Sequence, residues 1–166
     1  AHSWLMVSEV EVLSGGRNVA RGAAYEFWPR PSAPPGIRYA DDGIRLTDGI
    51  IAQGFDPALI AGWSDVPEAE VTVDLGGPHT IRQVTIHTLG GGRYGIVAPG
   101  RVLLETSTDG EAWTEAGAQD LSDPHDDTLA SMATALPVAD GTMARYVRVR
   151  LQGLAGWAML SEVEVR

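Results

Sequence analysis

Apolar and polar residues alternate in several short stretches of this chain, and such alternation is typical of a β-strand that buries one face. The clearest stretches are residues 71–75, 84–87, 102–107 and 146–151. No segment combines helical periodicity with capping residues at both ends, although residues 57–62 have room for one helical turn. The pattern therefore predicts a protein made of strands.

Turn-forming residues separate these strands. Asp109-Gly110 follows one strand and precedes Trp113, which predicts a hairpin. Gly-Gly-Pro at 76–78 and Pro-Val-Ala-Asp-Gly at 137–141 predict two further turns. With 20 glycines and 10 prolines in the chain, this succession of strands and turns favours an antiparallel β-sandwich or barrel.

The chain begins and ends with nearly the same nine residues. Trp4–Val12 and Trp157–Val165 are identical at seven of nine positions, and corresponding positions are offset by 153 residues. That offset is about the length of one domain. Residues 1–16 are then either the tail or closing strand of a preceding repeat in a tandem array, or an extra N-terminal strand of the domain formed by 17–166. Chance similarity is a less attractive explanation.

Composition narrows the possible partners. The chain has 166 residues, no cysteine and a net charge of −10, which fits one domain without disulfides or thiolate metal sites. All twelve cationic side chains are arginines, and they form no basic cluster, so nucleic acid is not an expected partner. No apolar stretch reaches about 18 residues, so membrane insertion is not expected either.

The sequence carries no recognisable catalytic motif. It lacks the nucleophile elbow, the zinc-protease helix motif and the phosphate loop. The carboxylate pair Glu162/Glu164 has its counterpart in Glu9/Glu11 of the repeated segment, which favours a structural role for both pairs. We therefore expect a protein that is not an enzyme.

Several segments, taken in order, resemble one known family. They are Asn18–Gly22, Leu46–Gly49, Trp63-Ser64, Val71–Gly76, Ile81–Ile86, Glu105–Trp113, Arg145–Val149 and Ser161–Val165. Their order and spacing resemble the discoidin, or coagulation factor 5/8 type C, superfamily, and most closely its family 32 carbohydrate-binding modules. The resemblance covers roughly residues 17–165. It implies an all-β fold, an antiparallel β-sandwich built as a discoidin-like jelly roll of eight strands.

A loop at residues 40–49 concentrates acidic side chains. Calcium prefers six to eight oxygen ligands from carboxylates and carbonyls, but aspartates also cap turns, and the residues alone leave both interpretations open. The resemblance implies a structural calcium ion (Ca²⁺). The ligand candidates are Asp48, Leu46 through its carbonyl, Glu162 of the closing strand, Asp41 and Asp42.

The predicted ligand site uses rings and guanidinium groups on loops. Aromatic rings cover the C–H faces of sugars, and arginine donates paired hydrogen bonds to neighbouring hydroxyls. Residues 28–38 are too rich in proline for a central strand and predict such a loop. The candidates are Trp28 and Arg30 in this loop, Arg93 and Tyr94 after three glycines, Trp157 after Gly156, and His87 at a predicted strand end. Trp63 and Trp113 are instead expected to be structural.

The resemblance thus implies a non-catalytic carbohydrate-binding module of a larger extracellular protein, secreted or at the cell surface. Its expected partners are an oligo- or polysaccharide and other modules of the same polypeptide. The alternative is a calcium-rigidified spacer or protein-adhesion domain without a sugar site.

Overall fold

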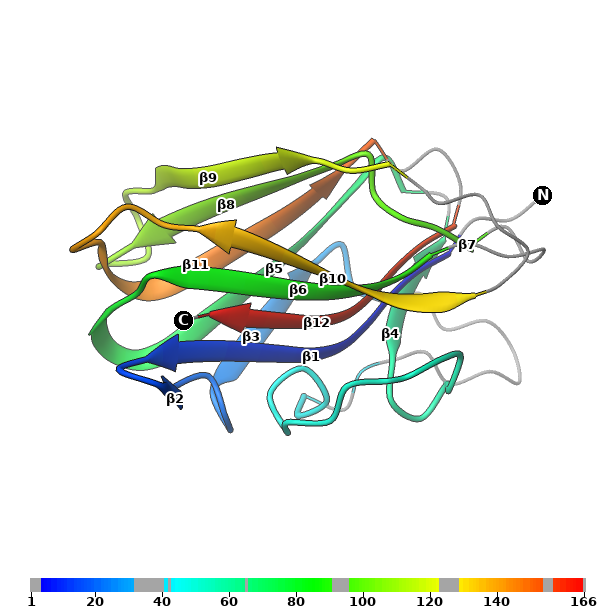
Figure 1. Ribbon diagram of the computed structural model, residues 1–166, viewed down its shortest axis with the longest axis horizontal. Coiled ribbons are helices and arrows are strands. Elements are labelled where there is room, and N and C mark those ends of the chain that lie inside the picture. The colour runs from blue at the N-terminus through cyan, green and yellow to red at the C-terminus, as the bar shows by residue number, and fades with distance from the viewer. Residues whose placement is uncertain are drawn as a thin grey trace.

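The computed structural model describes residues 4–31, 41, 43–64, 66–90, 96–122, 129–153 and 157–165, and β1 and β12 are described by their backbone pairing. Within these ranges the protein consists of strands and connecting loops, arranged as two packed sheets (Figure 1). No helix in the described part of the chain is long and apolar enough to cross a membrane. The predicted all-β fold is confirmed.

One sheet has five antiparallel strands. Its order is β3 (Ala24–Trp28), β5 (Glu68–Thr80), β11 (Met143–Gln152), β8 (Arg101–Ser107) and β9 (Thr114–Asp120). β8 and β9 form the hairpin predicted at Asp109-Gly110, so that prediction is confirmed.

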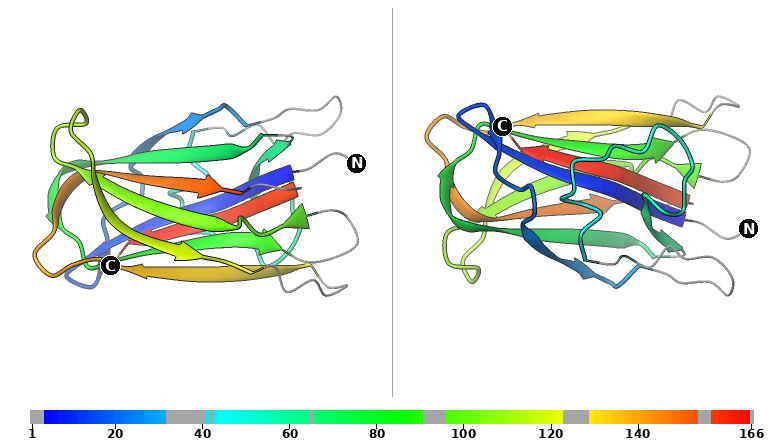
Figure 2. Two further views of the ribbon diagram at one scale, coloured as in Figure 1. Left: turned by 90° about the horizontal axis from the view of Figure 1, so that it is seen from above. Right: turned by 90° about the horizontal axis from the view of Figure 1, so that it is seen from below.

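The other sheet contains both copies of the repeated segment. Its strands are β10 (Ala130–Pro137), β6 (Gln83–Gly90), β1 (Trp4–Ser14), β12 (Trp157–Val165) and β7 (Ile96–Val97), with β2 (Arg17–Asn18) and β4 (Ala61–Ser64) paired to β1. β1 and β12 run parallel, side by side, as Figure 2 shows from above and below. Most other pairs are antiparallel, apart from the short parallel pair of β12 with β7.

The core lies between the sheets because one face of each strand is apolar. On β5 every second residue from Ala69 to Leu75 is buried, while the residues between them are half-buried. Trp63 on β4 is only 1% exposed, and Phe27 packs edge-on against it with ring centroids 5.0 Å apart. The structural role predicted for Trp63 is thereby confirmed.

Two local predictions are wrong. The turn expected at 76–78 is instead part of β5, which continues to Thr80. Gly76 has a φ of +75°, and the pairing of β5 with β11 slips between Ala144 and Tyr146, so the glycine accommodates a bulge rather than a reversal. The possible helical turn at 57–62 is also absent, because this described segment forms an ordinary turn that leads into β4.

Candidate functional site

A groove runs across the outer face of the five-stranded sheet. Val71 of β5 points into the core, so its neighbours Glu70 and Thr72 point outward. Pairing places Trp28 of β3 beside Glu70, and Arg148 of β11 beside Thr72. The groove above these residues has a volume of about 680 Å³, a size typical of small-ligand sites.

Trp28 forms one wall of the groove. It is the last residue of β3, and its side chain is 63% exposed. The preceding Phe27 packs against Trp63, and the indole Nε1 of Trp63 donates a hydrogen bond to the carbonyl oxygen of Pro29. The backbone on both sides of Trp28 is therefore anchored to the core, while its own indole ring lies open to solvent.

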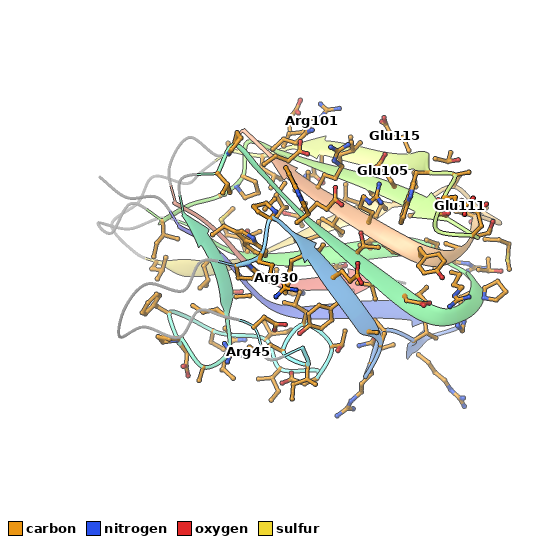
Figure 3. The ribbon with its side chains drawn as sticks, turned by 180° about the vertical axis from the view of Figure 1, so that it is seen from behind. Arg30, Arg45, Arg101, Glu105, Glu111 and Glu115 are labelled. Carbon is orange, nitrogen blue, oxygen red and sulfur yellow. The ribbon has the colours of Figure 1, made fainter. Side chains whose placement is uncertain are left out.

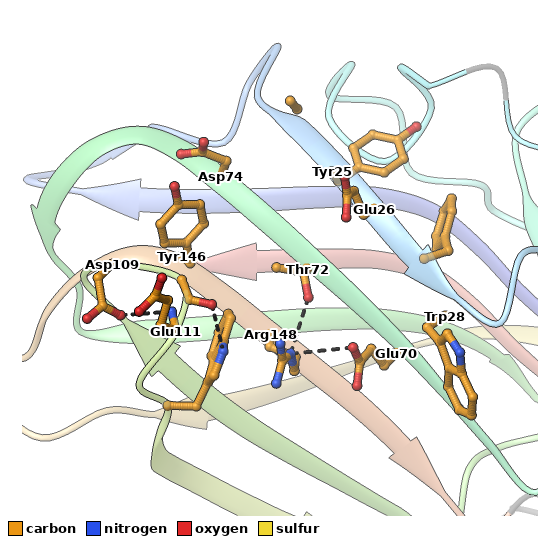
Figure 4. Close-up of a pocket in the computed structure, with 14 residues that line it drawn as sticks. Tyr25, Glu26, Trp28, Glu70, Thr72, Asp74, Asp109, Glu111, Tyr146 and Arg148 are labelled. Atoms are coloured by element: carbon orange, nitrogen blue, oxygen red, sulfur yellow. Dashed lines mark hydrogen bonds and ion pairs between the residues drawn. The ribbon is translucent and has the colours of Figure 1, made fainter.

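Arg148 lies on the floor of the groove. Its Nε donates to Thr72 Oγ1 at 3.3 Å and lies 3.5 Å from Glu70 Oε1, and its Nη1 lies 3.7 Å from Glu105 Oε2. Its guanidinium carbon is 3.6 Å from the centre of the Trp113 ring. Figure 4 shows Glu70 between Arg148 and Trp28, so a carboxylate lies at the middle of the groove.

The hairpin between β8 and β9 forms the opposite wall. Asp109 Oδ1 accepts hydrogen bonds from the backbone N–H groups of Glu111 and Ala112, both at 2.9 Å. These bonds hold the pKa of Asp109 below its ordinary value, and the bond from Ala112 has the largest effect. Trp113 Nε1 donates to the carbonyl of Gly110 at 3.2 Å, which fixes the indole over the sheet.

Gly110 is required by the close packing of this hairpin. Its φ is +82°, a conformation that other residues rarely adopt. A Cβ atom at this position would also lie 3.3 Å from Cε2 of Tyr146. The glycine lets the turn lie close to Tyr146 at the end of the groove.

The lining of the groove is acidic. Five carboxylates contribute to it against the single guanidinium of Arg148, and they are Glu26, Glu70, Asp74, Asp109 and Glu111. Asp74 is held by a two-pronged pair with Arg145, whose Nε and Nη2 donate at 2.9 and 2.8 Å. The hydrogen bond from Arg145 is the main reason that the pKa of Asp74 lies below its ordinary value. The groove therefore carries negative charge at neutral pH.

A further group of polar contacts joins β5 and β11 of the same sheet. Arg150 donates to Glu68 Oε1 at 2.6 Å through Nη2, and Gln152 donates to Glu68 Oε2 at 2.7 Å. Burial raises the pKa of Glu68, but the hydrogen bonds from Gln152 and Arg150 outweigh it and lower the pKa overall. Figure 3 looks onto this sheet, with Glu105 over its middle, Glu111 near one end, and Arg101 and Glu115 along the β8–β9 edge.

This arrangement suits a flat polar ligand. An open indole offers a surface for C–H groups. Carboxylates on the floor and walls accept hydrogen bonds from hydroxyl or amine groups. Because Arg148, Trp113 and Asp74 are already held by neighbours, binding would require little reordering of the floor.

The structure brings only some of the predicted ligand residues together. Trp28 is a wall of the groove, and Arg30 lines a neighbouring depression of about 570 Å³ with Pro31 and Asp41. Arg93 and Tyr94 lie outside the described residues. Trp157 is the first residue of β12 and pairs with Ile96.

The prediction that His87 lies at a strand end is wrong. β6 continues to Gly90, and His87 pairs with Ala133 on one side and with Glu162 on the other. It is therefore an interior position of the sheet, half-buried, and it is not part of the groove.

Two of the predicted calcium ligands, Asp41 and Asp48, accept hydrogen bonds from neighbouring backbone N–H groups. Asp41 accepts hydrogen bonds from the Tyr25 hydroxyl and from the Gly43 N–H, both at 2.7 Å. Asp48 Oδ1 accepts from the Ile50 N–H at 2.8 Å. Asp42 lies outside the described residues, and the described ones contain no cluster of three or more acidic or histidine side chains. The side chain of Leu46 is fully buried.

Trp28 is the only predicted ligand residue among those that line the groove, and the residues missed include Glu70, Thr72, Trp113 and Arg148. The alternation that predicted the strands also marks Glu70, Thr72 and Arg148 as outward positions. Nothing in the sequence indicates that β5 and β11 are neighbours, which is what places them together. Trp113 packs on the hairpin, which agrees with the structural role predicted for it, and it also lines the groove.

The two sheets and the sheet groove define a β-sandwich of the discoidin-like class, and comparisons with known proteins give the family. A family model described as the F5/8 type C domain matches residues 47–163. This match spans more than half of the chain, which therefore belongs to the F5/8 type C domain family. No curated protein sequence matches the chain.

Solved structures confirm the fold at low sequence identity. The C-terminal domain of a chitobiase from Bacteroides fragilis has a TM-score of 0.58 at 22% identity, covering 86% of this chain and 93% of that chain. Chitosan-binding module 1 from a Paenibacillus chitosanase/glucanase has a TM-score of 0.56 at 18% identity, covering 90% and 98%. The Clostridium perfringens module CpGH89CBM32-5, in complex with GalNAc-β-1,3-galactose, has a TM-score of 0.55 at 17% identity, covering 86% and 94%. The structural neighbours are thus family 32 carbohydrate-binding modules of glycoside hydrolases, and the predicted resemblance is confirmed.

Proposed function

We propose that this chain is a non-catalytic carbohydrate-binding module that holds a glycan in the groove on its five-stranded sheet. The observation that carries the proposal is the indole of Trp28, 63% exposed on an anchored strand beside the carboxylate of Glu70. An exposed tryptophan next to fixed hydrogen-bond acceptors is a combination that suits a sugar ring. The similar structures, which include sugar-binding modules, support the same class of ligand.

The charge of the groove favours a particular kind of glycan. Glu26 and Glu111 line it, and the Arg148 guanidinium is already engaged by Glu70 and Thr72. An acidic groove repels uronic acids and attracts protonated amines. We therefore propose that amino sugars such as glucosamine oligomers bind better than neutral or acidic oligosaccharides.

The module would act by anchoring. A glycan-binding domain brings a linked protein, here a glycan-active extracellular one, to a polysaccharide or a surface glycan. Neighbouring modules of the same polypeptide would raise the weak affinity of one site through their effective concentration.

We further propose a structural calcium ion at the loop that contains Asp48. Asp48 Oδ1 is used by the Ile50 N–H, whereas its other carboxylate oxygen has no partner in the described part of the chain, so the residue fits a ligand. The loop is held against its neighbour by a 2.9 Å bond from Gly22 N–H to the Thr47 carbonyl. Asp48, the Leu46 carbonyl and Glu162 would hold the ion, while both oxygens of Asp41 already accept hydrogen bonds. Bound calcium would tie this loop to the closing strand.

Titration calorimetry with chitotriose, N-acetylchitotriose and galacturonate trisaccharide, each with and without calcium, tests the proposed function. We expect measurable binding of at least one sugar, with chitotriose the tightest. The absence of binding to these sugars and to a broad glycan array would favour the alternative, a calcium-rigidified spacer or adhesion domain.

A further inference from the structure

The two copies of the repeated segment lie in register with each other. β1 and β12 pair in parallel, and in each of the four recorded pairs a residue of β1 faces its own counterpart in the repeat: Glu9 faces Glu162, Val10 faces Val163, Glu11 faces Glu164, and Val12 faces Val165. Residues that correspond to each other in the sequence repeat, 153 positions apart, are therefore also paired with each other in the sheet.

Both copies also pair with the same residues of β6. Ile86 pairs with Val10 of β1 and with Val163 of β12. Thr85 likewise pairs with Glu11 and with Glu164, and Thr88 with Val7 and with Leu160. Both ladders also have an irregularity at the same place, just after Val7 in one copy and just after Leu160 in the other.

Only one edge of β6 is available for pairing with β1 or β12. Its other edge is used by β10, where Ile86 pairs with Thr134 and Thr85 with Ala135. Adjacent strands lie about 4.8 Å apart, so one edge completes a ladder with one strand at a time. The fold thus provides one position beside β6, and the chain provides two nearly identical strands for it.

Sequence identity explains why either copy fits. Register in a sheet is set by the alternation of apolar and polar residues, and Ser-Glu-Val-Glu-Val is the same in both copies. The family match, residues 47–163, includes most of β12 and none of β1. The β12 copy therefore belongs to the strands that the family shares, while β1 is the additional copy.

We propose that β1 and β12 are alternative occupants of a single strand position beside β6, and that the copy outside this position can complete the same position in a second copy of this chain. The interaction is strand addition: backbone hydrogen bonds supply affinity, and the alternating side chains supply register. Its recognition element is the repeated segment itself, so the partner must present a β6 edge that is open.

Matched proline variants test whether the two strands are alternatives. Proline removes a backbone donor, and two consecutive prolines remove one N–H from each side of a strand. The variants are V10P/E11P for β1, V163P/E164P for β12, and the combination of all four. We expect each double variant to melt within about 4 °C of the wild type, because the other copy fills the position, and the quadruple variant to lose its cooperative transition. A loss of the transition in V163P/E164P alone would overturn the proposal, since it would show that β1 cannot replace β12.

Addition of a strand from outside tests the second half of the proposal. The probe is a synthetic peptide with the sequence of residues 1–14, and the control peptide carries V10P/E11P. We expect the probe to restore cooperative melting to the quadruple variant, and the control peptide to have no effect. Failure of the probe at millimolar concentration would overturn the exchange between copies. As a second measurement, hydrogen exchange at Thr85 and Ile86 of V163P/E164P must stay protected if β1 occupies the edge, and rapid exchange there would contradict the proposal.

Discussion

The guanidinium carbon of Arg148 lies 3.6 Å from the centre of the Trp113 ring. This contact joins the middle of β11 to the hairpin between β8 and β9. The same guanidinium group also forms ion pairs with Glu70 and Glu105. Arg150 also approaches these two carboxylates, at 3.6 and 3.9 Å, but Arg148 alone of the two cations stacks on Trp113 among the described contacts.

Replacement of Arg148 by methionine should lower both stability and glycan affinity. The change removes the cation from the Trp113 ring and leaves two half-buried carboxylates without it, a loss of about 2 kcal/mol. In a domain of this size such a loss lowers the melting temperature by about 4–8 °C. Arg148→Lys should recover part of the stability but not the flat stacking on the indole.

The control is Arg101→Met, which breaks an exposed pair with Asp120 outside the groove. Exposed pairs contribute little, so this variant should melt like the wild type. Equal effects of both substitutions, measured by calorimetry, would contradict the role given to Arg148.

Trp28→Ala should weaken glycan binding without a change in melting temperature. The indole is 63% exposed, so its removal costs little core packing, but it removes the stacking wall of the groove. We expect affinity to fall by about tenfold or more, equivalent to about 1.4 kcal/mol. Phe55→Ala is the matched control, because Phe55 is 45% exposed and lies outside the groove lining. Unchanged titration curves for Trp28→Ala would show that the sugar does not bind in the groove.

Glu26→Gln and Glu111→Gln should reduce binding of chitotriose more than binding of its N-acetylated form. Both carboxylates line the groove, and only the unacetylated sugar carries protonated amines that they attract. The preference should also shrink as salt is raised from about 0.01 to 1 M, because the screening length shortens. Glu115→Gln, on β9 and outside the lining, serves as the control. A selectivity that is unaltered in both groove variants would rule out a charge-based preference.

Removal of calcium should lower the melting temperature of the wild type but not that of Asp48→Asn. Metal that binds only the folded state stabilises it in proportion to the logarithm of its concentration. Asp56→Asn is the matched control, since Asp56 Oδ1 also caps a turn, through the Ala58 N–H at 2.9 Å. The control should keep the calcium response, measured by scanning calorimetry before and after treatment with a chelator. A wild type that melts at one temperature in both conditions would refute the metal site.

Asp74→Asn should destabilise the protein at neutral pH and have little effect in acid. Because the hydrogen bond from Arg145 lowers the folded-state pKa of Asp74 below 3.8, the pair contributes stability above that pH, and the contribution is lost as the pH falls through the folded-state pKa. The difference in melting temperature between wild type and variant should therefore be largest near pH 7 and vanish well below pH 3.8. Both side chains are about a third or more exposed, so the effect should be modest. A difference that is the same at pH 7 and pH 2 would show that the ion pair is not its cause.

The strands could be predicted from the sequence because their signal is local. Val71–Leu75 and Tyr146–Leu151 alternate within themselves, and Asp109-Gly110 needs only its own turn geometry. The extension of β5 through Gly76-Gly77-Pro78 could not be predicted, since a bulge and a turn use the same residues and only pairing with β11 separates them.

The groove was only partly predictable for a similar reason. Trp28 is conspicuous in the sequence because a proline-rich stretch follows it. Thr72 and Arg148 are unremarkable until the order of β5 and β11 in the sheet brings them within 3.3 Å. The repeated segment was visible at once, but its significance for β6 depends on pairing partners that lie far away in the chain.

The parallel pairing of β1 with β12 also has a mechanical consequence. Figure 1 shows the N-terminal end of β1 and the C-terminal end of β12 at opposite ends of the sandwich. A pulling force applied through the two termini would run along these strands, so the hydrogen bonds between β1 and β12 would be loaded together in shear instead of opening one after another. A module held under tension between a surface and a moving load would resist extension best along this axis.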